Sequence, residues 1–294
     1  MLNVLIVTDS AASFPDRTAL QSPHLRIVPC HVHIDGQDLL EGVDISTRDV
    51  WEKLRTSRTP PVISPPTPLD FYKVFEQASG IYDGILSIHS SAALSDSYAH
   101  ATAAANRISG RCQFAQIDSQ ALCVGQGLLV EEALRQVHVS ATFDDFVRDI
   151  RNLTQRLFGI HYVESTETLL HNGIVSAEHS VLSSMLGVKP LLTIDNGKIV
   201  TTGKARTRAQ LVDQLIEFAQ GFEAFDAAVI VQPDVPQRSE TTRMLLNRLT
   251  DTFPGRSFLL SGYAPALASI IGPHAGGLVI LGSQLSEEHG TYED

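Results

Sequence analysis

Hydroxyl groups gather where three short apolar runs of the sequence end. The residues that follow these runs are Thr8, Asp9 and Ser10, then His89, Ser90 and Ser91, then Asp118 and Ser119. In an open α/β sheet, ligands bind beyond the carboxyl ends of the strands, so these residues are the first candidates for a ligand site. Ser95 and Asp96 then lead into a helical stretch, where free backbone N–H groups meet serine hydroxyls. This combination suits an anion such as a carboxylate, although capping the helix is the commoner role of such residues.

A stiff, proline-rich segment at residues 59–68 is a second candidate. Its five prolines fix the backbone φ angle, so the segment can hold Ser64 and Thr67 in a defined place. A spacer between domains, or the lead-in to a helix over residues 69–78, explains the same residues without a ligand.

Several catalytic and metal-binding patterns are absent or incomplete. The chain has no G-x-S-x-G elbow and no P-loop, and Gly125 and Gly127 lack the third glycine of a dinucleotide-binding loop. His31 and His33 would share one face of a strand and could chelate a metal, but an ordinary surface strand is the better interpretation. His274 lies in a glycine-rich loop, where a structural role is usual and a hydrogen bond into a cleft between two domains is the alternative.

These candidates need a fold that brings strand ends together, and the hydrophobic pattern predicts one. Short apolar runs alternate with helical stretches, which is typical of a parallel sheet covered by helices. The predicted strands are residues 3–7, 82–88 and 113–117, and the predicted helices are residues 97–108, 124–137 and 143–153. Residues 26–34, followed by Asp35-Gly36, predict a small β-hairpin inserted at about residues 26–45.

From about residue 157 the pattern predicts a second α/β domain. Strands are expected at residues 158–163, 227–231, 258–260 and 278–281, a hairpin at residues 189–200, and helices at residues 180–187, 211–222 and 244–253. We therefore expect an α/β fold with an N-terminal domain over residues 1–156 and a C-terminal domain over residues 157–294.

Composition limits the classes of function. The chain has 294 residues, with 22 Lys and Arg against 33 Asp and Glu, so its net charge is −11. Such an acidic chain lacks the basic surface that nucleic acid requires. The first residues do not form a signal peptide, Pro265 and Pro273 interrupt the most apolar late stretch, and three cysteines are too few for a disulfide framework. We expect a cytoplasmic protein without stable membrane insertion.

Nine short motifs occur in one order along nearly the whole chain. They are Val7-Thr-Asp-Ser10, the hairpin from Pro29 to Gly36, Glu41-Gly-Val-Asp44, Ser64-Pro-Pro-Thr67, Ser87 to Ser91 with Leu94 to Tyr98, Ile117-Asp-Ser119, Lys189-Pro190, Gly203 to Arg208, and Gly272-Pro-His-Ala-Gly276. Each motif is weak alone, but the series resembles the DegV family of bacterial fatty-acid-binding proteins.

The resemblance implies a Rossmann-like N-terminal domain with a small β insertion and a C-terminal α/β domain, with a long-chain fatty acid in a tunnel between them. It also implies a binding protein without catalysis or cofactor, which presents the acid to a separate ATP-dependent fatty acid kinase subunit. That kinase makes acyl phosphate for phospholipid synthesis. Carried over position by position, the resemblance places Ser64, Thr67, Ser91, Ser95 and His274 around the carboxylate.

The chain departs from the family pattern at several positions, among them Pro65 in place of a glutamine and the glycine loop after His274, which lacks the usual proline. Ile63 stands where the family has a threonine, Asp96 where it has a glycine, and Ile174 where it has an arginine. A carboxylate of Asp96 turned toward the ligand would repel a second carboxylate. The ligand class or chain length can therefore differ here.

Two other functions fit the sequence. Ser91 and His274 could be the nucleophile and base of a small acyl hydrolase, which requires a hydrogen bond between them. The protein could also be a general small-ligand sensor. Lys204, Arg206 and Arg208 form a compact basic cluster, for which a solvated face is the simpler interpretation and docking of the kinase is the alternative.

Overall fold

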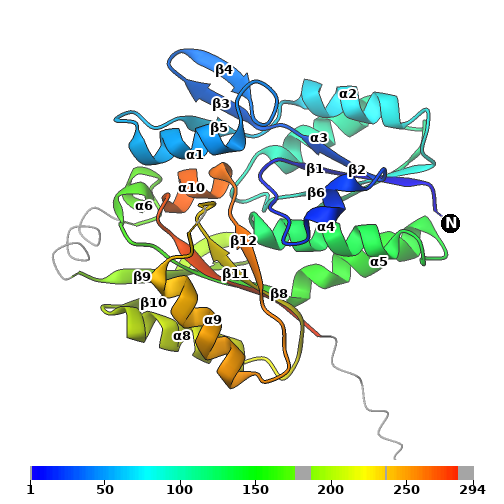
Figure 1. Cartoon of the computed structure of the whole chain (residues 1–294). Helices are drawn as coiled ribbons and strands as arrows, with labels where there is room; N and C mark the ends of the chain where they lie inside the picture. Colours follow the sequence, from blue (N-terminus) through cyan, green and yellow to red (C-terminus); the bar gives the residue numbers. More distant parts are fainter. Residues whose placement is uncertain (1, 176–186, 236, 284–294) are drawn as a thin grey trace, which may run out of the picture.

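The computed structural model describes residues 2–175, 187–235 and 237–283, and it contains two α/β domains that lie against each other (Figure 1). Each domain is built around its own sheet, and this confirms the predicted fold class. The predicted helix at residues 180–187 falls almost entirely outside the described residues. Within the described residues, no helix combines the length and apolar character needed to cross a bilayer.

The N-terminal domain is built on a four-stranded parallel sheet. In spatial order its strands are β2 (Leu25–Val28), β1 (Val4–Asp9), β6 (Gly84–His89) and β7 (Gln113–Asp118). All residues of β1 and β6 are buried, which is typical of parallel strands covered on both faces. The helices α2 (Pro68–Ala78) and α3 (Ser97–Ala105) cover one face, and α4 (Val124–Gln136) and α5 (Phe143–Leu153) cover the other. The carboxyl ends of β1 and β6 therefore meet at one edge of this sheet.

A small antiparallel sheet lies beside the domain, as predicted, but its bounds differ from the prediction. Its strands, in spatial order, are β4 (Gln37–Leu40), β3 (His31–Ile34) and β5 (Val62–Ser64). Along the chain, helix α1 (Thr47–Thr56) lies between β4 and β5. The prediction of one strand across residues 26–34 was wrong, because β2 pairs with β1 in the main sheet and the chain leaves that sheet at Pro29. A proline has no N–H to continue the ladder. The turn at Asp35 and Gly36 is confirmed, and both residues have positive φ.

The C-terminal domain contains a six-stranded mixed sheet. In spatial order its strands are β10 (Lys198–Ala205), β9 (Lys189–Asp195), β8 (Leu157–Tyr162), β13 (Gly276–Gly282), β11 (Phe225–Gln232) and β12 (Leu259–Gly262). The helices α8 (Arg208–Gln220) and α9 (Glu240–Thr252) cover one face. Two short helices, α6 (Glu167–His171) and α10 (Pro265–Ile271), lie on the side of the small sheet (Figure 1).

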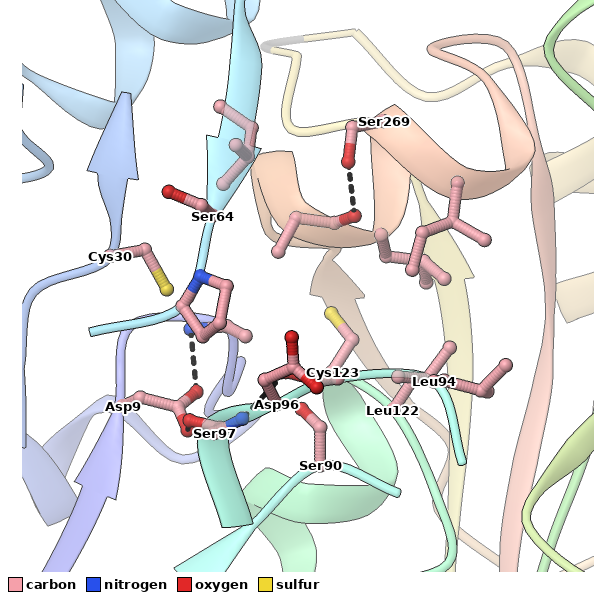
Figure 2. Close-up of a pocket in the computed structure, with 17 residues that line it drawn as sticks. Asp9, Cys30, Ser64, Ser90, Leu94, Asp96, Ser97, Leu122, Cys123 and Ser269 are labelled. Carbon is pink, nitrogen blue, oxygen red and sulfur yellow. Dashed lines mark hydrogen bonds between the residues drawn. The ribbon is translucent and has the colours of Figure 1, made fainter. Parts of the chain in front are cut away.

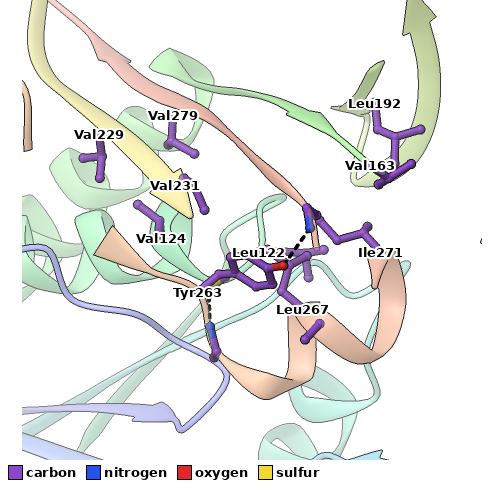
Figure 3. Close-up of a cluster of buried hydrophobic side chains, with 14 of the residues drawn as sticks. Leu122, Val124, Val163, Leu192, Val229, Val231, Tyr263, Leu267, Ile271 and Val279 are labelled. Carbon is purple, nitrogen blue, oxygen red and sulfur yellow. Dashed lines mark hydrogen bonds between the residues drawn. The ribbon is translucent and has the colours of Figure 1, made fainter. Parts of the chain in front are cut away.

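An apolar cluster joins the two domains, and we call it the interdomain cluster. Figure 3 shows its centre, where Leu122 and Val124 from the N-terminal domain pack with Tyr263, Leu267 and residues of β11 and β13. The Trp51 indole of α1 donates a hydrogen bond of 3.2 Å to the Tyr263 carbonyl oxygen, and the two rings lie 5.0 Å apart. The interface between the domains is therefore a buried apolar core rather than a hydrated polar surface.

Candidate functional site

A cavity of about 190 Å³ lies beyond the carboxyl ends of β1 and β6, between the N-terminal domain, β5 and α10 (Figure 2). We call it the strand-end cavity. Its polar wall includes Asp9, Ser64, Ser90, Ser95, Asp96, Ser97 and Ser269. Its apolar wall is formed by Ile63, Leu94, Leu122, Leu267 and Ile270. This is the position at which open α/β sheets bind their ligands.

Asp9 is a buried carboxylate in the wall of the strand-end cavity. It accepts hydrogen bonds from His89 Nδ1 at 2.9 Å, from the Ser97 hydroxyl at 2.5 Å and from Gln126 Nε2 at 3.2 Å. Burial alone would raise the pKa of the Asp9 carboxyl, but the hydrogen bonds and charge of His89, helped by Ser97 and Gln126, hold that pKa below its usual value. The cavity therefore has a fixed negative charge that is paired from behind by His89.

The proline-rich segment contributes Ser64 to the cavity but directs Thr67 elsewhere. The Ser64 hydroxyl lies 2.7 Å from His33 Nε2, and Ser64 belongs to β5. Thr67 is exposed and is the N-cap of α2, where its side chain and that of Asp70 form a capping box. The helix lead-in considered from the sequence is therefore present, and Thr67 does not line the cavity.

The loop after β6 contributes Ser95, whereas Ser91 faces the C-terminal domain. The Ser91 side chain is buried, and its hydroxyl donates to the Gly197 carbonyl oxygen at 2.6 Å. Ser95 lines the cavity, and Asp96 beside it is exposed and makes no side-chain capping bond to α3. The loop amides of Ala93, Leu94, Ser95 and Ser97 bond to oxygen atoms within residues 91–95.

His274 is exposed in the loop between α10 and β13 and is not part of the cavity wall. The structure does not pair it with Ser91, whose proton goes to Gly197. The hydrogen bond on which the hydrolase alternative rests is therefore not made. The roles assigned to Thr67, Ser91 and His274 at a carboxylate remain predictions without support from this geometry.

Two thiols in the cavity wall were missed as site residues. Cys30 lies just after β2 and Cys123 lies just before α4 (Figure 2). Burial raises the pKa of the Cys30 thiol well above its usual value and that of Cys123 to about 11, so both are neutral at physiological pH. The Cys123 sulfur accepts a hydrogen bond from the Ala264 amide of the other domain at 3.1 Å.

The α10 wall of the cavity was also missed, because residues 265–271 are too short and too uniformly apolar to show helical periodicity. The available signal was Pro265, which occupies the first turn of the helix, where proline is favoured. Asp9, Ser90 and Ser97, by contrast, stand in the strand-end motifs that the sequence singled out.

His31 and His33 meet acidic groups that sequence spacing did not reveal. His31 Nδ1 lies 2.9 Å from Asp38 and its Nε2 lies 3.0 Å from Asp70, and this pairing raises the pKa of His31 despite partial burial, which opposes it. Among the described residues, no group of three or more His, Cys, Asp or Glu side chains is arranged to hold a metal ion.

A wider cavity of about 540 Å³ lies between the loop after β1 and the end of β12. Its wall includes Arg17, Asp234 and the buried Glu41, whose pKa burial raises although Ser10 and Thr47 donate hydrogen bonds to it. Neither the proline-rich segment nor the loop after β6 contributes to this wall. The strand-end cavity is therefore the one that the proline-rich segment and the loop after β6 line.

Comparison with known proteins places the chain in a family. A sequence model described as "Uncharacterised protein, DegV family" matches residues 3–283. A DegV domain-containing protein of Streptomyces coelicolor is 30% identical over 280 residues, which cover 93% of this chain and 95% of that protein. A DegV domain-containing protein of Listeria innocua is 26% identical over 279 residues, which cover 94% of this chain and 97% of that protein.

Solved structures have the same fold. A fatty-acid-binding DegV family protein of Streptococcus agalactiae superposes with a TM-score of 0.85 at 20% identity, and the match covers 97% of this chain and all of that one. A DegV family protein of Thermus thermophilus, described by its fatty acid binding, gives a TM-score of 0.83 at 23% identity over 96% of this chain and all of that one. The sequence match runs nearly end to end, and the chain belongs to the DegV family.

Proposed function

We propose that this protein binds a long-chain fatty acid, with its carboxyl group in the strand-end cavity and its tail in the interdomain cluster. The observation that carries this proposal is the continuity of the two. Leu94, Leu122, Leu267 and Ile270 line the cavity and also belong to the interdomain cluster or pack against it. A polar end that opens onto an apolar core fits a molecule with a polar head and an apolar tail.

Proteins of this fold support the choice of ligand. The neighbours include a stearic-acid-binding protein of Eubacterium ventriosum and a DegV family protein of Eubacterium eligens loaded with heptadecanoic acid. Each buried CH₂ group of the tail would contribute about 0.8 kcal/mol to binding. The cavity of about 190 Å³ is smaller than the usual ligand pocket of roughly 300 to 1,000 Å³, so it suits the head group while side chains of the cluster move to accept the tail.

The test is mass spectrometry of the protein purified from a bacterial host, first under native conditions and then after denaturing extraction. We expect a near-stoichiometric long-chain acid that is released only on unfolding. A Leu94→Asp variant should carry much less acid, because it puts a charge where the head-group site meets the tail site. Leu69→Asp is the matched control, since Leu69 is 52% exposed on α2 and lies outside the cavity wall. Protein that is empty and takes up no added acid would overturn the proposal.

We also propose that the bound acid is presented to an ATP-dependent fatty acid kinase subunit, and that the basic cluster docks that subunit. Lys204 and Arg206 are exposed, whereas Arg208 pairs with Glu240. Arg206→Glu should slow phosphorylation of the bound acid and leave acid binding unchanged. Arg151→Glu, an exposed change on α5 of the other domain, is the control. Equal rates in the two variants, or loss of acid binding in Arg206→Glu, would contradict docking through Arg206.

A further inference from the structure

The serine hydroxyls of the strand-end cavity offer lone pairs rather than protons. Ser90 donates its hydroxyl proton to Gln126 Oε1 at 2.7 Å, Ser97 donates to Asp9 at 2.5 Å, and Ser269 donates to the Ala266 carbonyl oxygen at 2.8 Å. A hydroxyl has one proton and two acceptor lone pairs. These three groups can therefore accept a hydrogen bond from a ligand but cannot donate one without losing a protein contact.

The Ser64 hydroxyl likewise uses its proton within the protein when it donates to His33. His33 Nδ1 lies 3.4 Å from Asp38 Oδ1, and this carboxylate favours the tautomer with its proton on Nδ1. Nε2 then lacks a proton and accepts that of the Ser64 hydroxyl across 2.7 Å. Ser64 is left with lone pairs for the cavity.

Ser95 is the exception among the cavity serines. Its hydroxyl oxygen accepts the Ser97 amide at 3.3 Å, and within the described residues no acceptor takes its own proton. The cavity wall therefore combines one free hydroxyl donor with several acceptors.

The charged groups of the cavity wall have one sign. Among the described residues that line it, the charged side chains are Asp9 and Asp96, and none is Lys, Arg or His. His89 is hydrogen-bonded to Asp9 through Nδ1 from outside the wall, and the thiols of Cys30 and Cys123 are neutral. Farther out, Glu41 lies behind Ser10 and adds a further acidic group, while His31 and Asp70 lie beyond His33. A second carboxylate placed beside Asp9 and Asp96 would be repelled.

We infer that the strand-end cavity takes its ligand's head group in a neutral, hydrogen-bond-donating form, so that a fatty acid binds as the protonated acid. This inference rests on the proposed function. A protonated carboxyl has one O–H donor and one carbonyl acceptor. These match the lone pairs of the cavity serines and the Ser95 proton respectively, whereas both Asp9 oxygens already accept two protein hydrogen bonds each. Above the pKa of the free acid, the carboxylate takes up a proton from solvent when it binds. No bond to carbon forms or breaks. A primary alcohol of the same chain length should then be an alternative ligand.

The test compares myristic acid with tetradecan-1-ol by calorimetry from about pH 6 to about pH 9, in two buffers of different ionisation enthalpy. Affinity for the acid should fall about tenfold per pH unit above its own pKa, with uptake of about one proton, because only the protonated form binds. Affinity for the alcohol should stay flat. Acid affinity that stays equal across this range without proton uptake would overturn the inference and leave the proposed function standing. Acid that binds at no pH would overturn both.

A charge added at the cavity edge gives a second measurement. Asp96 is exposed and makes no capping bond, so Asp96→Lys should fold normally. It should raise affinity for myristate at about pH 9, relative to affinity for tetradecan-1-ol in the same variant, by about tenfold or more. Asp251→Lys, on exposed α9 surface, is the control. No rise in Asp96→Lys, or an equal rise in the control, would contradict the inference.

Discussion

The Ser91 hydroxyl donates a hydrogen bond of 2.6 Å to the Gly197 carbonyl oxygen and joins the loop after β6 to the β9–β10 turn of the other domain. Ser91 is fully buried, so Ser91→Ala leaves that carbonyl without a partner and should lower the free energy of unfolding by about 1 to 3 kcal/mol. Urea denaturation measures this loss. Ser79→Ala is the control, since the Ser79 hydroxyl bonds within the last turn of α2 at an exposed site. Equal losses in both variants would show that the contact between the domains adds nothing.

The buried pair of Asp9 and His89 should be the most sensitive point of the N-terminal domain. Asp9→Asn removes the buried carboxylate that accepts the hydrogen bonds of His89 Nδ1 and the Ser97 hydroxyl, and losing two such bonds costs about 3 kcal/mol or more. The folded pKa of Asp9 lies below its unfolded value of 3.8, so its contribution is present above pH 3.8 and is lost as pH falls through the lower folded pKa. Denaturation at neutral pH should therefore separate the variant from the parent, and strongly acidic pH should bring them together. An Asp9→Asn protein as stable as the parent at neutral pH would contradict this account.

Glu131 should make the protein less stable as pH rises toward neutrality. It is buried on α4, where burial raises its pKa from 4.5 to about 7 although its carboxylate accepts the Asp16 amide at 2.9 Å. Between these values the unfolded chain has lost the proton that the folded chain keeps, so the stabilisation present below 4.5 is lost as pH rises through about 7. Glu131→Gln keeps the acceptor oxygen and removes the charge. It should stabilise the protein by on the order of 1 to 2 kcal/mol at about pH 8.

Thermal unfolding of Glu131→Gln and parent from about pH 4 to about pH 8 measures this effect. The two melting temperatures should diverge above about pH 5, with the variant more stable. Glu132→Gln is the matched control, because Glu132 is the next residue of α4 and pairs with Arg135 at a partly exposed site. Parallel pH profiles for parent and Glu131→Gln would exclude Glu131 as the source.

The alternation of apolar runs and helical stretches predicted the fold because this pattern reflects which side chains are buried, and burial determines how strands and helices pack. Predictions failed where a short segment depends on a distant neighbour. The run over residues 26–34 reads as one strand, yet Val28 pairs with Asp9 and Val32 pairs with Leu39, in two different sheets. The apolar helix α10 forms one wall of the cavity only because the preceding strand, β12, ends beside it.

The site was predictable where it depends on strand ends, and not where it depends on hydrogen-bond direction. The motif after β1 pointed to Asp9 and the motif after β6 pointed to Ser90 and Ser95. The sequence could not tell that the Ser91 proton goes to Gly197, because that partner lies 106 residues away and in the other domain.

Thr67 and Ser95 were both predicted as hydroxyls for the ligand, and the fold gives them different uses. Thr67 caps α2, so Thr67→Ala should lower the free energy of unfolding by about 1 kcal/mol and leave fatty acid affinity unchanged. Ser95 has a proton free for the ligand, so Ser95→Ala should weaken fatty acid binding about tenfold, whereas the loss of its long contact with the Ser97 amide should lower the free energy of unfolding by no more than about 1 kcal/mol. Calorimetry of binding and of unfolding on both variants separates the two roles. Weaker binding in Thr67→Ala with normal stability would return Thr67 to the ligand site, because a helix cap alone cannot produce that pattern.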